Sequence, residues 1–340
     1  MEQTIFGKTG LTVSRTGFGC IPIQRISFDE STALLRRAYE GGITFYDTAN
    51  GYTTSEERIG IALHDVRDKI VLCTKSFPGT PAQIEANLDK SLKMLQTDYI
   101  DIYQVHNPSF VPRPGGDDGV YDFLLKAKEA GKIRHIGITN HSKDRAREAI
   151  LSDLYDTLQY PLSCLSSEME LELVDLCREH DMGVLAMKAL SGGLITNAKA
   201  AFAFLRQYDN VVPIWGMQRI SELDEFLSFE KQPPVMDADL QKEIEAVKAE
   251  LQGDFCRGCG YCLPCAADIP IPTAGRITFL LGRSLAERLL TPDMQEQMKR
   301  IDNCTGCGHC KEHCPYGLDV PELLKRQKAG YFEILAQQGK

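Results

Sequence analysis

The chain has 340 residues, with 47 Asp and Glu against 38 Lys and Arg, which gives a formal net charge of −9. This composition is typical of a folded protein with one large and one small domain. The acidic balance argues against nucleic acid as the main partner, because phosphate binding needs a basic surface. No apolar run reaches the ~18 residues of a membrane span and no secretory signal is visible, so we predict a cytoplasmic protein with no membrane partner.

Short runs rich in β-branched residues alternate with amphipathic stretches between residues 15 and 229. Strands with little polar alternation, each followed by a helix, are typical of a parallel sheet buried on both faces. Eight such units predict an α/β fold, a closed (β/α)8 TIM barrel, with a doubly wound open sheet as the alternative. The predicted strands are residues 15–20, 43–47, 70–74, 99–105, 133–138, 156–160, 183–187 and 211–215.

Capping signals predict where several helices begin, because a Ser or Thr hydroxyl and a Glu three residues later satisfy the first free amides. These signals are Ser27 with Glu30, Thr54 with Glu57, and Thr80 followed by Pro81. The pair Pro233–Pro234 and a change in composition predict a domain boundary. We therefore expect a barrel over residues 1–235, a connecting helix over 236–251, and a small, mainly helical domain over 252–340 that ends in a helix.

Ionisable residues stand at three neighbouring strand ends, where the active site of such a barrel lies. Asp47 ends one strand, Tyr52 follows five residues later, and Lys75 and His106 end the next two strands. The set suits carbonyl reduction, because a hydride arriving on the carbonyl carbon leaves an oxygen that needs a proton. We expect Tyr52 to donate that proton, Lys75 to lower the pKa of Tyr52, Asp47 to hold Lys75, and His106 to orient the carbonyl oxygen.

The stretches GITFYDTANGY, IVLCTK and YIDIYQVHN, with the opening FGKTGLTVSRTGFG, resemble aldo-keto reductases over residues 1–230. The catalytic tetrad of that family is Asp, Tyr, Lys and His in this order. The resemblance implies an N-terminal hairpin and an NAD(P)-dependent oxidoreductase that acts on a small carbonyl or alcohol substrate, and it favours NADP(H) over NAD(H). The cofactor-binding residues that it implies are Thr139, Asn140, Gln159, Met187, Gly216, Gln218, Arg219 and Glu225.

Two positions depart from the family pattern. Met187 stands where a Tyr usually stacks on the nicotinamide, and Gln218 and Phe226 replace a basic residue and an Asn after the last strand. Arg219 still offers a positive charge for a 2′-phosphate.

Eight of the 12 cysteines fall between Cys256 and Cys314, in the motifs CRGCGYCLPC and CTGCGHCKEHCP. The second motif has the spacing of bacterial [4Fe-4S] proteins, and the first departs from that spacing at its fourth Cys. In a reducing compartment, thiols this dense indicate metal sites rather than disulfides. We predict two [4Fe-4S] clusters in a ferredoxin-like domain, with two structural zinc sites as the alternative.

In ferredoxin-like pairs the last Cys of each motif ligates the other cluster. We therefore assign Cys256, Cys259, Cys262 and Cys314 to one cluster, and Cys304, Cys307, Cys310 and Cys265 to the other. Such clusters carry electrons, which implies a redox partner protein such as a ferredoxin. Two other functions remain open: a non-catalytic electron-transfer or scaffold subunit, and a reductase fed by the clusters without nicotinamide as its sole donor.

Overall fold

The computed structural model describes residues 1–250, 255–281 and 289–338. Contacts within the chain divide it into two compact units. The first contains Met1–Ala189 and Ala198–Asp237, and the second contains Leu190–Asn197 and Ala238–Lys340. The helix expected over 236–251 begins at Ala238 and belongs to the second unit.

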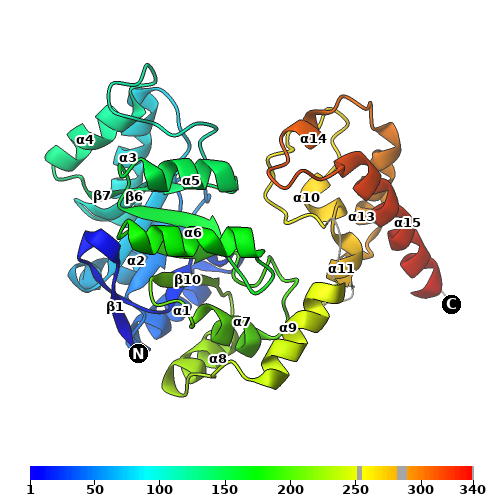
Figure 1. The fold of residues 1–340 in the computed structure, drawn as a ribbon, viewed down its shortest axis with the longest axis horizontal. Helices are drawn as coiled ribbons and strands as arrows, with labels where there is room; N and C mark the ends of the chain where they lie inside the picture. Colours follow the sequence, from blue (N-terminus) through cyan, green and yellow to red (C-terminus); the bar gives the residue numbers. More distant parts are fainter. Residues whose placement is uncertain (251–254, 282–288, 339–340) are drawn as a thin grey trace. The chain divides into compact units, whose positions relative to one another are not determined.

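The first unit is a closed barrel of eight parallel strands in the order β10-β3-β4-β5-β6-β7-β8-β9. Figure 1 labels β6, β7 and β10 of this barrel and several of the helices that surround it, such as α5 and α6. The predicted (β/α)8 barrel is confirmed, and the open sheet is excluded because β10 pairs with both β3 and β9. Each predicted strand is present: β3 (Gly17–Gly19), β4 (Phe45–Asp47), β5 (Val71–Ser76), β6 (Ile100–His106), β7 (Ile133–Thr139), β8 (Thr157–Pro161), β9 (Gly183–Met187) and β10 (Val211–Gly216).

Helices follow the strands around the barrel. Their bounds are α1 (Phe28–Glu40), α2 (Ser55–Leu63), α3 (Pro81–Leu95), α4 (Val120–Glu129), α5 (Lys143–Leu151), α6 (Glu168–Glu179), α7 (Ala198–Leu205) and α8 (Ile220–Lys231). Short 3-10 helices are η1 (Gly7–Thr9), η2 (Pro22–Arg25) and η3 (His64–Lys69). Four of these helices, α1, α3, α5 and α6, begin after a Ser or Thr whose hydroxyl, or whose Glu or Gln partner three residues on, binds the first free amides.

The capping predictions are confirmed at Ser27, where Glu30 completes the box, and at Thr80, which precedes Pro81. The predicted box at Thr54 is wrong. The Thr54 hydroxyl accepts a hydrogen bond of 2.9 Å from Arg58 Nε and caps no backbone amide. The four-residue spacing on α2 brings that guanidinium over the hydroxyl, and a charged donor competes well with a neutral amide.

An antiparallel hairpin of β1 (Gln3–Ile5) and β2 (Thr12–Ser14) precedes the barrel, as expected. Phe6 follows β1 and packs edge-to-face on Phe45, with ring centroids 5.6 Å apart. Phe6 and Val13 join strand residues in one buried apolar cluster. The hairpin therefore supplies side chains that fill the barrel interior, and the polar site lies among the carboxyl ends of the strands.

The second unit is mainly helical. Its elements are α9 (Ala238–Glu250), α10 (Ile271–Ala274), α11 (Ile277–Leu281), α13 (Pro292–Lys299), η4 (Arg300–Asn303), α14 (His309–Glu312) and α15 (Val320–Gln338). The long helix α15 contacts α10, α11 and α14 and buries Leu323, Leu324 and Tyr331. The apolar stretch over residues 277–290 is helical at Ile277–Leu281, and residues 282–288 lie outside the described ranges. None of the described helices has the length and apolar character needed to cross a bilayer.

The close approach of α2 and α3 at Gly60 gives a stability test. A Cβ built on Gly60 would stand 2.3 Å from Met94 O and 2.9 Å from Leu95 C, so helix backbone must move to admit it. We expect Gly60→Ala to lower the free energy of unfolding by about 1–3 kcal/mol, although Ala alone favours a helix by about 1 kcal/mol. Urea unfolding followed by the fluorescence of Trp215, the sole tryptophan, measures this. The neighbouring exposed control Ile61→Ala should change it by less than about 1 kcal/mol; a stabilised Gly60→Ala would contradict the packing.

Candidate active site and metal centres

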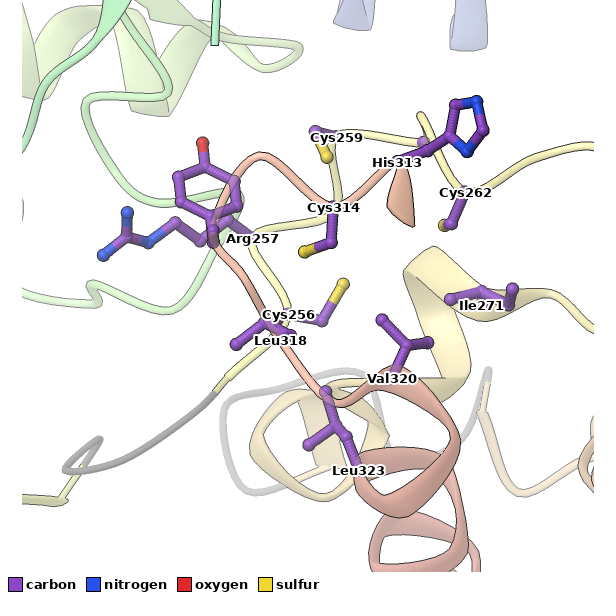
Figure 2. A pocket seen from close by; sticks show the side chains of 12 residues that line it. Cys256, Arg257, Cys259, Cys262, Ile271, His313, Cys314, Leu318, Val320 and Leu323 are labelled. Carbon is purple, nitrogen blue, oxygen red and sulfur yellow. The ribbon is translucent and has the colours of Figure 1, made fainter. Parts of the chain in front are cut away.

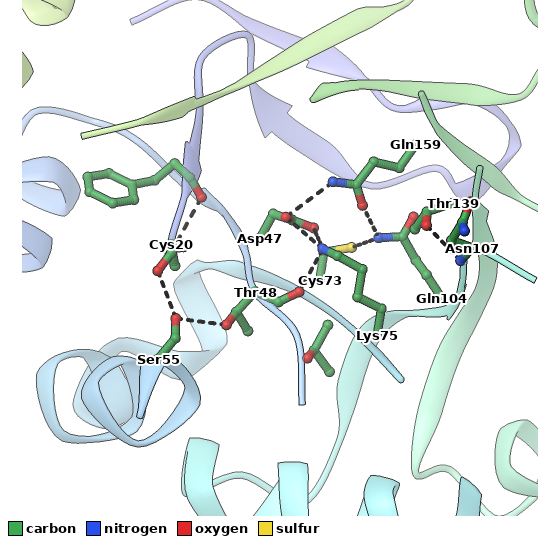
Figure 3. A network of polar contacts seen from close by, with 12 residues as sticks. Cys20, Asp47, Thr48, Ser55, Cys73, Lys75, Gln104, Asn107, Thr139 and Gln159 are labelled. Atoms are coloured by element: carbon green, nitrogen blue, oxygen red, sulfur yellow. Dashed lines mark hydrogen bonds and ion pairs between the residues drawn. The ribbon is translucent and has the colours of Figure 1, made fainter. Parts of the chain in front are cut away.

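A buried ion pair lies at the ends of β4 and β5 (Figure 3). Lys75 Nζ donates to both carboxylate oxygens of Asp47, each at 2.8 Å, and to Thr48 O at 2.7 Å. Lys75 is 1% exposed and Asp47 is 3% exposed. Burial is the largest single effect and disfavours the charged ammonium, but Asp47, Tyr52 and Cys73 together outweigh it and raise the pKa of Lys75. A permanent positive charge is therefore held at the mouth of the barrel.

Tyr52 lies over this charge, because Lys75 Nζ stands 5.5 Å from the centroid of the Tyr52 ring. Burial raises the pKa of Tyr52, and Lys75 lowers it by less, so the net direction is upward. Lys75 lowers the pKa of Tyr52, as expected, but the net shift is upward because removing the phenol from water costs more than the nearby cation returns. Tyr52 is a protonated phenol at neutral pH.

His106 completes the set. Its ring stands edge-to-face to Tyr52, with centroids 6.2 Å apart at 84°. Burial, with a smaller contribution from Lys75, lowers the pKa of His106 to about 3. Its Nδ1 is buried and finds no hydrogen-bond partner within the described ranges. A neutral imidazole with an unsatisfied nitrogen suits hydrogen bonding to a bound oxygen.

The sequence reasoning missed Phe77. Its ring stacks on His106, with centroids 4.4 Å apart and planes 10° from parallel, yet the side chain is 57% exposed. The available signal was its place two residues after Lys75, just beyond the end of β5. An exposed aromatic ring held over the site offers an apolar surface to a substrate.

Gln159 links the tetrad to the next strands, as Figure 3 shows. Its Nε2 donates to Asp47 Oδ2 at 3.3 Å, and its Oε1 accepts from Gln104 Nε2 at 2.8 Å. Gln104, a second residue that sequence reasoning missed, also donates to Cys73 Sγ at 2.9 Å. This chain of amides fixes the orientation of the Asp47 carboxylate.

Thr139 and Asn140, two of the residues expected to hold nicotinamide, are buried at the end of β7. Thr139 Oγ1 accepts from Asn107 N at 3.0 Å. Asn140 Nδ2 donates to Pro108 O at 2.9 Å, and its Oδ1 accepts from Ser142 N at 2.8 Å. An amide side chain has two donor hydrogens and two acceptor positions, so Asn140 keeps one of each for a ligand.

The residues expected to hold the rest of the cofactor lie around the start of α8. Glu222 Oε2 accepts from the backbone amides of Gln218 and Arg219, at 2.9 and 3.2 Å. The Arg219 side chain is 71% exposed and pairs with Glu222 at 3.1 Å. Gly216 and Glu225 are also exposed. In the described part of the chain, no contact joins these residues to the tetrad.

The two departures from the family pattern differ in their surroundings. Met187 is half-buried and packs against the apolar core of the barrel. Phe226 is 3% exposed and stacks on Trp215, with ring centroids 4.5 Å apart. Phe226 is thus part of the packing between helix and barrel.

In the second unit, four cysteines from both motifs line one small cavity: Cys256, Cys259, Cys262 and Cys314. Figure 2 shows the Cys256 and Cys314 side chains pointing toward one another from separate segments of the chain. Leu318, Val320 and Leu323 line the cavity from its apolar side. Gly258 N donates to Cys256 Sγ at 3.3 Å, as amides beside iron–sulfur thiolates do.

The other four cysteines interact electrostatically across the motifs. Burial raises the pKa of Cys310, and the nearby thiols of Cys304, Cys307 and Cys265 raise it further. Cys304 and Cys307 are exposed, whereas Cys256 and Cys262 are buried. The two groups of thiols therefore differ in their access to solvent.

The fold is that of a (β/α)8-barrel protein joined to a cysteine-rich helical unit. Residues 15–202 match the Aldo/keto reductase family, and residues 255–319 match the 4Fe-4S dicluster domain. Because the first match covers more than half of the chain, this protein belongs to the aldo/keto reductase family and carries a C-terminal 4Fe-4S dicluster domain.

The chain is similar to several curated proteins. It is 33% identical over 216 residues to aldo-keto reductase YhdN of Bacillus subtilis, a match covering 58% of this chain and 64% of that protein. It is 31% identical over 213 residues to probable aldo-keto reductase 1 of Glycine max, covering 57% and 60%. The match thus spans less than two thirds of the length of these two relatives.

Solved structures share the barrel fold. An aldo-keto reductase from Klebsiella pneumoniae in complex with NADPH gives a TM-score of 0.63 at 22% identity, covering 73% of this chain and 95% of that one. AKR11C1 from Bacillus halodurans gives 0.63 at 22% identity, covering 73% and 96%.

The low pKa of His106 predicts a pH effect on stability. An unfolded His titrates near ~6.5 and the folded one at about 3, so below ~6.5 only the unfolded chain gains this proton. Stability is therefore lost as the pH falls from ~6.5 toward 3. We expect the wild type to lose about 1.5 kcal/mol more than His106→Gln between pH 6.5 and pH 5. Urea unfolding at both pH values measures this, and the exposed control His64→Gln should behave as wild type. Equal losses in wild type and His106→Gln would contradict the buried neutral imidazole.

Proposed function

We propose that the barrel is an NAD(P)-dependent oxidoreductase that reduces a small aldehyde or ketone, or oxidises the alcohol. The observation that carries this proposal is the buried Lys75–Asp47 pair beneath Tyr52 and beside His106. The overall step adds a hydride to the carbonyl carbon and a proton to its oxygen, which balances as two electrons and two protons.

The residues of the chain act on the oxygen. Tyr52, kept protonated by burial, is the proton donor in reduction. The positive charge of Lys75 stabilises the phenolate that remains, and Asp47 keeps Lys75 in place. His106 Nδ1, buried and unpartnered in the described structure, is the proposed hydrogen-bonding group for the carbonyl oxygen. Phe77 covers the site with an apolar ring.

The barrel residues fit a nicotinamide in part. When bound, the cofactor supplies or accepts the hydride. Thr139, Asn140 and Gln159 would hold its carboxamide, because all three are buried polar groups at adjacent strand ends with hydrogen-bonding capacity to spare. NADP(H) is favoured, since Arg219 keeps an exposed guanidinium for a 2′-phosphate. The NADPH complex of the Klebsiella relative supports the same preference.

Two observations support two [4Fe-4S] clusters in the second unit: four of its thiols line one cavity, and the thiols of Cys304, Cys307 and Cys265 act electrostatically on Cys310. We propose one cluster on Cys256, Cys259, Cys262 and Cys314, and the other on Cys304, Cys307, Cys310 and Cys265. Each such cluster would accept one electron. Two zinc ions remain the alternative occupants.

We further propose that a redox protein such as a ferredoxin exchanges electrons at the set containing Cys304 and Cys307, because these thiols are the exposed ones. Met187 and the buried Phe226 favour a second function, in which two electrons from the clusters and one proton replace the hydride. Titration of the protein with NADPH and NADH separates the two, because only the first function requires a nicotinamide fluorescence change.

Tyr52→Phe tests the barrel mechanism. The change removes one hydroxyl and leaves the ring that packs near His106, so we expect a folded protein with carbonyl reduction lowered at least ~100-fold. NADPH oxidation with a panel of small aldehydes measures the rate. Tyr39→Phe on α1 is the matched control and should keep the wild-type rate. Near-normal turnover in Tyr52→Phe would remove Tyr52 from the mechanism.

Cys314→Ser tests the crossed assignment. Protein prepared without oxygen should contain about eight iron and eight sulfide per chain. We expect Cys314→Ser to alter the same electron paramagnetic resonance signal as Cys256→Ser, and Cys304→Ser to alter the other one. Cys177→Ser, a buried barrel cysteine, is the control that should leave both signals intact. A shared signal change for Cys314→Ser and Cys304→Ser, without Cys256→Ser, would refute the crossing, and a zinc-loaded wild type would refute the clusters.

A further inference from the structure

Arg276 lies against the first cysteine motif. It stands between α10 and α11 and is half-buried. A Cβ built on Gly258 would stand 2.7 Å from Arg276 Cζ, and Gly258 lies between Cys256 and Cys259 with a φ of +63°. The guanidinium therefore packs on the backbone of the loop that carries these two thiols.

Hydrogen bonds hold the guanidinium in this place. Arg276 Nε donates to Pro272 O at 3.1 Å, and Nη1 donates to Gly192 O at 3.5 Å. A Cβ on Gly192 would stand 2.6 Å from Nη1, so Arg276 fits closely between two glycines. Both acceptors are neutral carbonyls, and no carboxylate pairs with Arg276 within residues 1–250, 255–281 and 289–338. The charge of Arg276 is therefore not neutralised by a described carboxylate and acts on the nearby thiols of Cys256 and Cys259.

The electrostatics of Arg276 agree with that position. Burial lowers its pKa, while the thiols of Cys256 and Cys259 raise it. The cations near the second motif are instead matched by carboxylates: Lys311 with Asp319, Arg300 with Asp268, and Lys328 with Asp302. The two sets of thiols therefore differ in the charge that faces them.

We propose that Arg276 raises the reduction potential of the cluster on Cys256, Cys259, Cys262 and Cys314, and leaves that of the other cluster unchanged. This inference rests on the clusters of the proposed function. A [4Fe-4S] cluster with four thiolates changes from a charge of about −2 to about −3 when it gains one electron. A fixed cation stabilises the more negative state more, and partial burial weakens the screening.

Arg276→Gln removes the charge and keeps a polar side chain. The full-length protein, prepared without oxygen, is titrated with dithionite as the electron donor while the resonance signal of each reduced cluster is followed. The first cluster is the one whose signal Cys256→Ser alters. At the potential where it is half reduced in the wild type, we expect its reduced-to-oxidised ratio to fall about tenfold, equivalent to about 59 mV. The signal of the second cluster should titrate as in the wild type.

Two further variants separate charge from packing. Lys242→Gln removes one positive charge from an exposed position of α9 and should leave both potentials unchanged. Arg276→Lys keeps the charge, so its ratio should stay within about threefold of wild type. A tenfold fall in Arg276→Lys, or an unshifted Arg276→Gln, would overturn the role of Arg276. If Arg276→Gln fails to hold its cluster, Arg276→Lys alone decides.

Iron and sulfide analysis of the wild type distinguishes a failure of the Arg276 inference from a failure of the proposed two-cluster function. A wild type without clusters overturns both. A wild type with two clusters, in which the Arg276 variants behave as the Lys242→Gln control, overturns only the role of Arg276 and leaves the proposed function standing.

Discussion

The chemistry of the barrel depends on one buried ion pair. Lys75 and Asp47 are almost fully removed from water, and the cost of their desolvation is met by their mutual attraction and by the Thr48 carbonyl. Such a pair adds little net stability compared with packed apolar residues. Its effect is to place a fixed cation among groups that respond to it. That cation lowers the pKa of His106, which helps to keep the imidazole neutral. It also favours the ionised form of Tyr52 over the protonated form.

The parallel barrel makes this arrangement possible, because it brings the carboxyl ends of consecutive strands to one mouth. Asp47 is in register with Cys73, and Lys75 with Gln104, so each polar group lies beside the next strand's contribution. Gln104 and Gln159 then connect the ion pair to the residues that would meet a nicotinamide. The tetrad and the proposed nicotinamide contacts at Thr139 and Gln159 therefore belong to one polar layer above an apolar core.

Sequence periodicity predicted the strands and hence the meeting of Asp47, Lys75 and His106, because a strand end defines where its last side chain lies. It did not reveal Gln104, which reads as one more residue within a buried strand, or Phe77, whose ring finds its place only when three strand ends converge. The Thr54 cap failed because Arg58 competes for the hydroxyl. The sequence indicated that Lys75 lowers the pKa of Tyr52, but not the larger effect of burial, because burial depends on loops that the sequence does not position.

The second unit is discontinuous along the chain, since it takes in Leu190–Asn197 as well as the residues after Asp237. Gly192, from the short insert, accepts a hydrogen bond from Arg276 beside the first cysteine motif. Cleavage of the chain after Asp237 would therefore give a cysteine-rich fragment that lacks Leu190–Asn197. The barrel fragment would keep this segment without the rest of the unit to which it belongs. The two parts are not interchangeable modules: a graft onto another barrel would have to carry the loop after β9 along with the tail.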